Sequence, residues 1–176
     1  MSSHRIKLLS GGWFDFIDFH LSEYSIEDIA HNLSRICRFN GATKKHYSVA
    51  QHSVIVSHVV PEKYAMSGLL HDSAESFIGD MSSPLKQLQP TFKKLEIDIE
   101  RYMFGKMGIP FPMHSSIKLA DLQVLAAEIR DLQPHASDWA GVIDIEPYPK
   151  KIIAWNTDKA YNEFMKRYEE LTGDNK

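Results

Sequence analysis

Residues 68–76 read GLLHDSAES, and this stretch decides the fold around it. The run is largely apolar, and helical periodicity predicts a helix that begins at Pro61 and ends near Ile78. His71 and Asp72 fall inside it, where a charged carboxylate beside an imidazole is costly to bury without a partner. The pair could be hydrogen-bonded within the core, but a divalent cation accepts both imidazole nitrogen and carboxylate oxygen. The stretch therefore predicts a buried helix that carries part of a metal site.

Helical periodicity continues on both sides of this stretch. The expected helices are Ile26 to an end near Arg38–Gly41, Val49 to Val59, Pro61 to about Ile78, Phe92 to Met107, Ser116 to Leu132 and Thr157 to Leu171. Ser25 with Asp28 and Ser48 with Gln51 are typical of capping boxes, and Gly41 can supply a left-handed turn after the first helix.

Two segments break the helical pattern. Residues 7–19, KLLSGGWFDFIDF, place Ser-Gly-Gly between short apolar runs, which predicts a small hairpin that packs as an edge flap. Proline and glycine between Gln133 and Asn156 favour an irregular connection. The fold class expected is thus all-α, a helical bundle with a small N-terminal β-hairpin.

Composition limits the classes of function. The chain of 176 residues suits a single domain, 1–176, and its formal charge of −3 offers no global attraction to nucleic acid or anionic lipid. One cysteine excludes an intrachain disulfide, the N-terminus lacks the pattern of a secretory signal, and no apolar run reaches the roughly 18 residues of a membrane helix. We expect a cytoplasmic protein without nucleic-acid or membrane partners.

His52 and Asp121 are the best candidates to complete the metal site. Each lies on its own expected helix between apolar neighbours, so each should point toward the interior of the bundle. Together with His71 and Asp72 they form a cage of two imidazoles and two carboxylates. Such a cage accepts one divalent ion, which could be Zn, Mn, Co, Ni or Mg.

Five ordered segments then carry a resemblance to a known family. RICRFNG, YSVAQHS, LLHDSAES, GDMSSPLK and KLADLQ, between residues 35 and 123, stand in the order seen in HD-domain nucleotide phosphohydrolases. The chain looks especially like the compact phage and prophage branch, which is similar to bacterial 5′-deoxynucleotidases and includes phage dATP triphosphohydrolases. The resemblance implies that His52, His71, Asp72 and Asp121 are metal ligands, and for a phage-encoded protein it implies the host cytoplasm.

The resemblance also implies roles for two further acids. Glu75 and Asp80 would order and deprotonate the attacking water or handle the leaving oxygen. Metal-bound water becomes acidic enough to supply hydroxide near neutral pH, and a neighbouring carboxylate can position its proton. A solvated helix-face acid at Glu75 and an Asx cap at Asp80 are the alternatives.

Substrate-binding residues follow from the same reasoning. Arg38, Lys86 and Lys118 are candidate phosphate ligands, since Arg offers a planar fork and Lys a point charge to phosphate oxygens. Family members similarly carry a cation at the positions of Arg38 and Lys86. Phe39 stands where relatives place an aromatic, usually Trp, beside the sugar, and Pro84 would lie near the base.

The leading hypothesis is a metal-dependent phosphohydrolase that cleaves deoxynucleotides at the α-phosphorus. dATP is the best single substrate, giving deoxynucleoside and triphosphate, with 5′-deoxynucleotidase activity on monophosphates as a variant. A cyclic-nucleotide or second-messenger phosphodiesterase and a non-catalytic nucleotide-binding module are the alternatives. Small relatives form dimers or rings of six, so we also expect a homo-oligomer.

Overall fold

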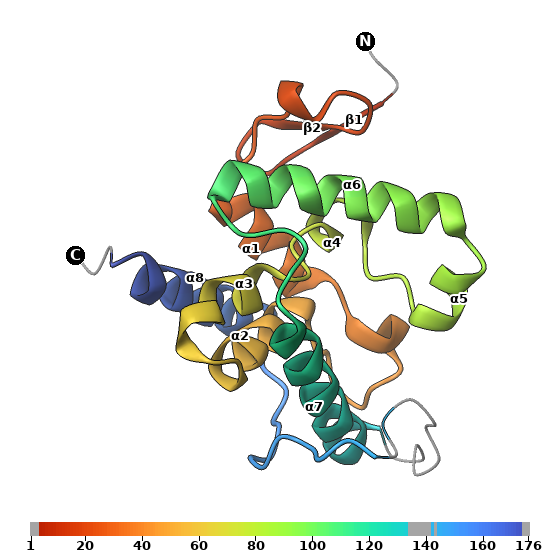
Figure 1. Ribbon diagram of the computed structural model, residues 1–176, viewed down its shortest axis with the longest axis vertical. Coiled ribbons are helices and arrows are strands. Elements are labelled where there is room, and N and C mark those ends of the chain that lie inside the picture. Colours follow the sequence, from red (N-terminus) through yellow and green to blue (C-terminus); the bar gives the residue numbers. More distant parts are fainter. Residues whose placement is uncertain (1–3, 134–141, 143, 174–176) are drawn as a thin grey trace.

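The computed structural model describes residues 4–133, 142 and 144–173, and in them the chain is mostly helical with one small hairpin (Figure 1). The strands are β1 (Arg5–Lys7) and β2 (Trp13–Asp15), and the helices are α1 (Ile26–Arg35), α2 (Val49–Val59), α3 (Ala65–Leu70), α4 (Glu75–Ile78), α5 (Ser83–Gln87), α6 (Pro90–Met107), α7 (Ser115–Leu132) and α8 (Thr157–Thr172). Short 3-10 turns lie at Phe19–Leu21, Arg38–Gly41 and Glu62–Tyr64. The expected all-α fold with an N-terminal hairpin is confirmed.

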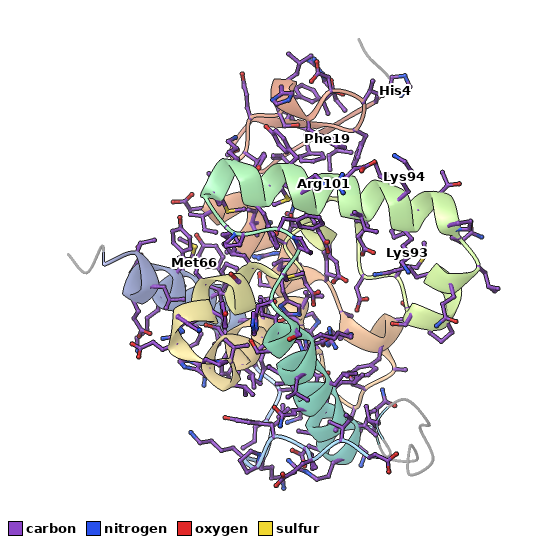
Figure 2. All side chains as sticks on the ribbon, viewed as in Figure 1. His4, Phe19, Met66, Lys93, Lys94 and Arg101 are labelled. Atoms are coloured by element: carbon purple, nitrogen blue, oxygen red, sulfur yellow. The ribbon has the colours of Figure 1, made fainter. Side chains whose placement is uncertain are left out.

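The hairpin is anchored to the core by aromatic side chains. Ile6 pairs with Phe14 in the antiparallel ladder, and the buried ring of Phe14 stacks on Phe77 of α4 with centroids 3.9 Å apart. Figure 2 shows Phe19 between the hairpin and α6, where its ring centroid lies 5.6 Å from that of Tyr102. The hairpin and the turn after it therefore cover one end of the core by packing on α4 and α6.

Helix α2 stands at the centre of the bundle. It packs against α1, α3, α7 and α8, and its buried face joins two apolar clusters. Val49, Ala50 and Val54 belong to the cluster that also contains residues of α1, α4, α6 and α8, whereas Val56 belongs to the cluster lined by α7. A side chain on α2 between these clusters is therefore shielded from water on all sides.

The first helix is shorter than expected. Ser25 caps α1 in a complete capping box with Asp28, as predicted, but the helix ends at Arg35 rather than near Arg38–Gly41. Cys37 leaves the helix because its backbone forms an isolated bridge with Ser48, just before α2. This bridge brings the following segment, Arg38–Gly41, alongside the start of α2.

The helix expected from Pro61 to Ile78 is divided into α3 and α4. Residues 71–74 form tight turns between them, with i→i−3 hydrogen bonds from Ser73 to Leu70 and from Glu75 to Asp72. Such bonds tighten the backbone as in a 3-10 turn. The interruption falls at His71-Asp72 and changes the direction in which those two side chains leave the chain.

Gln51 takes a role that the sequence did not predict. Ser48 caps α2 by accepting a hydrogen bond from the Gln51 N–H, but the Gln51 side chain does not close the expected capping box. It donates to the Ile153 carbonyl at 2.9 Å and accepts from the Trp155 N–H at 2.8 Å. The irregular connection before α8 is thereby fixed to α2.

The remaining helix boundaries agree within two residues, whereas the hairpin expected over residues 7–19 runs from Arg5 to Asp15. Helix α6 begins at Pro90 instead of Phe92 because proline is favoured in the first turn, and α5 was not expected. Residues 134–141 and 143 of the expected connection, Trp139 among them, lie outside the described residues. Among the described residues, none of the helices has the length and apolar character needed to span a membrane.

Candidate metal centre

His52 occupies the second turn of α2 and is completely buried between the two apolar clusters. His71 and Asp72 reach it from the tightened turn after α3. The Nε2 atoms of the two imidazoles lie 3.3 Å apart, and Asp72 Oδ2 lies 3.1 Å from His71 Nε2 and 3.7 Å from His52 Nε2. His52, His71 and Asp72 therefore form a compact group that could hold a metal ion.

The other ring nitrogen of each histidine is already a donor. His71 Nδ1 lies 2.9 Å from the Gly68 carbonyl oxygen, which can only accept, so this nitrogen carries the proton. His52 Nδ1 lies 2.7 Å from a carboxylate oxygen of Glu128 and donates in the same way. The two Nε2 atoms consequently face each other as the nitrogens left to bind a cation, and at this distance they need either a proton or a metal ion between them.

Asp121 of α7 joins this group at its edge. Its Oδ1 lies 3.2 Å from His52 Nε2, whereas its Oδ2 pairs with Lys118 at 2.8 Å. Burial raises the pKa of Asp121, but the hydrogen bond and charge of His52 outweigh burial and hold the pKa well below its usual range. Asp121 thus adds a second ionised carboxylate beside His52.

The donor set fits a divalent ion. Ligand atoms about 2.0–2.2 Å from one ion lie roughly 3–3.5 Å from each other, and the distances among His52, His71 and Asp72 fall in that range or just above it. Asp121 meets this range at His52 but lies outside the compact group of three. Burial and the charge of Arg38 lower the pKa of His52, yet the surrounding carboxylates raise it to about 9. This point of the molecule therefore attracts positive charge, which a proton on His52 or a metal ion can supply.

Sequence reasoning missed Glu128. It lies on α7, is fully buried, and accepts hydrogen bonds from His52 and from Tyr47, whose hydroxyl is 2.7 Å away. Its second oxygen accepts from Nε and Nη2 of Arg38 at 3.2 and 3.1 Å. A signal existed in the sequence, because Glu128 follows Asp121 by two helical turns and is flanked by Ala127 and Ile129.

Glu75 and Asp80 lie in the same electrostatic neighbourhood. Glu75 is buried, and its Oε2 makes no hydrogen bond within the described part of the chain. Burial raises the pKa of Glu75 well above its usual value, and the charges of Asp72 and Asp80 add to the shift. Burial also raises the pKa of Asp80, against the lowering effect of Arg38. Both carboxyl groups thus bind a proton more tightly than an ordinary carboxyl group does.

The three candidate phosphate ligands differ in their surroundings. Arg38 is held by Glu128, and its Nη1 lies 3.7 Å from Asp72 Oδ2, at the metal-binding group itself. Lys86 forms a salt bridge of 2.6 Å with Glu96 of α6, a contact that sequence reasoning did not anticipate. Lys118 extends from α7 with a side chain that is 70% exposed.

Phe39 follows Arg38 in an unusual backbone conformation. Its φ of 57° and ψ of 29° are left-handed, as are those of Asn40, and bulky side chains rarely adopt this region. Backbone strain of this kind is most often retained next to functional sites. The ring lies 5.6 Å from the guanidinium carbon of Arg38 and packs on the apolar cluster that contains Tyr47.

Pro84 occupies the first turn of α5, where proline is favoured, and it is exposed. Its ring therefore lies on the helix that carries Lys86. The described contacts bring together His52, His71, Asp72, Asp121 and Arg38, with Glu75, Asp80 and Lys86 close enough to influence their charges.

Comparison with known proteins identifies relatives over nearly the whole chain. No family model matches the sequence. The chain is 37% identical over 169 residues to "Uncharacterized protein YfdR" of Escherichia coli K12, and the match covers 95% of each protein. It is 31% identical over 150 residues to "Uncharacterized protein RCAP_rcc00048" of Rhodobacter capsulatus, covering 80% of this chain and 75% of that relative. The chain belongs to the family of YfdR and RCAP_rcc00048.

Proposed function

We propose that this protein is an HD-type, metal-dependent phosphohydrolase that cleaves deoxynucleotides at the α-phosphorus. The observation that carries the proposal is the pair of Nε2 atoms of His52 and His71, 3.3 Å apart with both Nδ1 atoms committed as donors. The ordered motifs around these two histidines resemble those of HD-domain nucleotide phosphohydrolases, which supports the same reaction class.

His52, His71, Asp72 and Asp121 would hold one divalent ion. When bound, such an ion supplies a Lewis acid and lowers the pKa of water toward neutrality. Among the described residues, His52, His71 and Asp72 are the one group of three metal-capable side chains, which favours a single ion over two. Imidazole and carboxylate together suit Zn, Mn, Co, Ni or Mg.

Glu75 and Asp80 would move the protons of hydrolysis. Glu75 is the more deeply buried acid, and burial raises its pKa, so it would hold a proton more readily than an ordinary carboxyl group and donate it to the 5′-oxygen as the bond to the α-phosphorus breaks. Asp80 is less buried and can accept the proton of the attacking water. Water and dATP would then give deoxyadenosine and triphosphate.

The cationic side chains would receive the phosphates. Arg38 turns Nη1 toward the metal-binding group, which suits an oxygen of the α-phosphate. Lys118 is exposed on the helix that bears Asp121, and its ammonium group would bind oxygens of the β- and γ-phosphates. Lys86 would also bind a phosphate oxygen after its salt bridge to Glu96 breaks. Phe39 would border the sugar, and Pro84 the base.

An end-point assay tests the proposal. The full chain, loaded with Mn²⁺ or Co²⁺, is incubated with all ribo- and deoxynucleoside mono- and triphosphates and with cyclic nucleotides, and the products are separated by chromatography. We expect deoxyadenosine and triphosphate from dATP, and no turnover by a matched Asp72→Asn variant. Release of pyrophosphate, opening of cyclic nucleotides alone or inactivity on the whole panel would contradict the proposal.

A further inference from the structure

Glu128 is the point at which three parts of the site meet. One carboxylate oxygen accepts from the His52 Nδ1–H and from the Tyr47 hydroxyl, both at 2.7 Å, and the other accepts from two nitrogens of Arg38. His52 comes from α2, Arg38 from the 3-10 turn after α1, and Glu128 from α7. A single buried side chain thus ties together the three elements that surround the metal-binding group.

Only an ionised carboxylate can satisfy these partners. The partners approach as N–H and O–H donors, and a carboxylate is the one side-chain group of this size that accepts on both ends and donates on neither. An amide in the same place would turn its NH₂ group toward a donor on one side.

We propose that Glu128 is a positioning residue that sets both the orientation of His52 and the place of Arg38. By accepting the Nδ1–H of His52, it keeps Nδ1 as the donor and turns Nε2 toward His71 and Asp72, where Nε2 can bind a metal ion in place of a proton. By accepting two bonds from Arg38, it leaves Nη1 directed to Asp72. The inference rests on the proposed function and names the residue that couples metal binding to phosphate binding in it.

A purely structural role makes different predictions. If Glu128 only balances the buried charge of Arg38, any carboxylate at that position should serve, and metal affinity should follow protein stability. If it orients His52, the length of the side chain matters, because a carboxylate drawn back by one methylene cannot reach His52, Tyr47 and Arg38 together. Metal affinity, rather than melting temperature, separates the two roles.

The test is a titration of the metal-free full chain with Co²⁺, followed by the visible absorption spectrum of the bound ion. Loss of a carboxylate behind a metal-binding histidine typically weakens metal binding about 10- to 100-fold. We expect that loss for Glu128→Gln, with an altered Co²⁺ spectrum, and a clear though smaller loss for Glu128→Asp. The kcat of both variants on dATP should fall more than KM rises.

Two controls isolate the effect. Tyr47→Phe removes one donor but keeps the bonds to His52 and Arg38, so we expect less than a threefold change in the Co²⁺ dissociation constant. Glu96→Gln removes another buried acid that pairs with a cation, Lys86, without a contact to a histidine. It should lower the melting temperature and leave Co²⁺ affinity unchanged. If Glu128→Gln does not fold, Glu128→Asp gives the same comparison.

The outcomes separate this inference from the proposed function. Wild-type protein that binds no Co²⁺ overturns both. Wild-type protein that binds Co²⁺, together with a folded Glu128→Gln variant of equal affinity and spectrum, overturns the role of Glu128 alone. A Glu128→Asp variant that binds Co²⁺ with wild-type affinity also overturns it, because a carboxylate too short to contact His52, Tyr47 and Arg38 together would then be sufficient.

Discussion

Lys118 and Asp121 form an ion pair of 2.8 Å across one turn of α7, which gives Asp121 a cation on one oxygen and His52 on the other. Because the Lys118 side chain is 70% exposed, the pair contributes only about 0–1 kcal/mol to stability. Lys118 is therefore free to leave Asp121 when an anion approaches.

The first prediction follows from that pair. Lys118→Met should raise KM for a deoxynucleoside triphosphate severalfold, leave KM for a monophosphate within twofold, and keep the Co²⁺ dissociation constant unchanged. Steady-state kinetics on both substrates measure this, with Lys166→Met on α8 as an exposed control. An equal rise in KM for both substrates would assign Lys118 to the α-phosphate or to Asp121 instead.

Asp72 should be essential for the metal ion. Asp72→Ala removes one ligand from a small set, so bound metal and hydrolysis should be lost together, by at least about 100-fold. Metal analysis of the purified variant by mass spectrometry measures the first effect and the dATP assay the second. Asp158→Ala, an exposed aspartate of α8, is the control. Full activity in a metal-depleted Asp72→Ala protein would end the metal-dependent interpretation.

Glu75 should separate metal binding from turnover. Its Oε2 is buried without a hydrogen bond in the described residues, and its raised pKa suits a proton donor. Glu75→Gln keeps the shape but cannot release a proton, so kcat should fall by about 10²–10⁴-fold while Co²⁺ affinity is kept. Loss of the metal along with activity would instead make Glu75 a ligand.

Phe39 should control the choice of sugar. If its ring borders the ribose, an unpaired buried 2′-hydroxyl costs about 1–3 kcal/mol, which predicts a preference for dATP over ATP of roughly tenfold to a hundredfold. Phe39→Ala should reduce this ratio chiefly by improving ATP, whereas Phe39→Leu should keep most of it. Both specificity constants and the melting temperature are measured. A destabilised Phe39→Ala variant with an unchanged ratio would assign the ring to the core alone.

Glu100 should make the metal-free protein less stable as pH rises. Burial raises the pKa of Glu100 to about 7, and Glu96 and Asp72 add to the shift. The folded protein therefore keeps a proton that the unfolded chain releases near the ordinary value of 4.5, so stability is lost as pH rises through this window. Glu100→Gln should raise the melting temperature more at pH 7.5 than at pH 5.

The control for Glu100 lies on the same helix. Salt bridges to Lys94 and Arg101 lower the pKa of Asp98 below its usual value, so Asp98 is charged in both folded and unfolded chains above pH 5. Asp98→Asn should lower the melting temperature by the same amount at pH 5 and pH 7.5. A pH-independent effect of Glu100→Gln as well would show that Glu100 is ionised in the folded protein.

Much of the candidate site could be predicted because its residues interrupt apolar patterns. His52, His71 and Asp121 each stand among buried side chains, where a polar group requires a partner, and the structure brings all three into contact or near contact. Glu128 also stands among apolar residues, so the same argument would have predicted a buried partner for it. Its spacing of two turns from Asp121 is common for polar residues on helices, however, and does not by itself indicate a role in the site. Its role becomes visible only when α7 is packed against α2.

Other features depend on packing that local sequence does not encode. Lys86 pairs with Glu96 only because α5 folds back on α6. The apolar pattern around His71-Asp72 is continuous and predicts one helix, but the structure divides it into α3 and α4. At this division the side chains of His71 and Asp72 contact His52, a long-range contact that the local pattern does not encode. Phe39 adopts a left-handed conformation that propensity disfavours for an aromatic residue.

The two hydrogen bonds of the Gln51 side chain make the completion of the site depend on residues that are synthesised late. Gln51 precedes His52, yet its partners Ile153 and Trp155 lie more than 100 positions later in the sequence. Contacts of such long range form late, because loop closure must come first. A nascent chain arrested before residue 150 would contain every proposed metal ligand and Glu128, but α2 would lack this anchor. Tight metal binding should therefore arise only after Ile153 and Trp155 have reached Gln51.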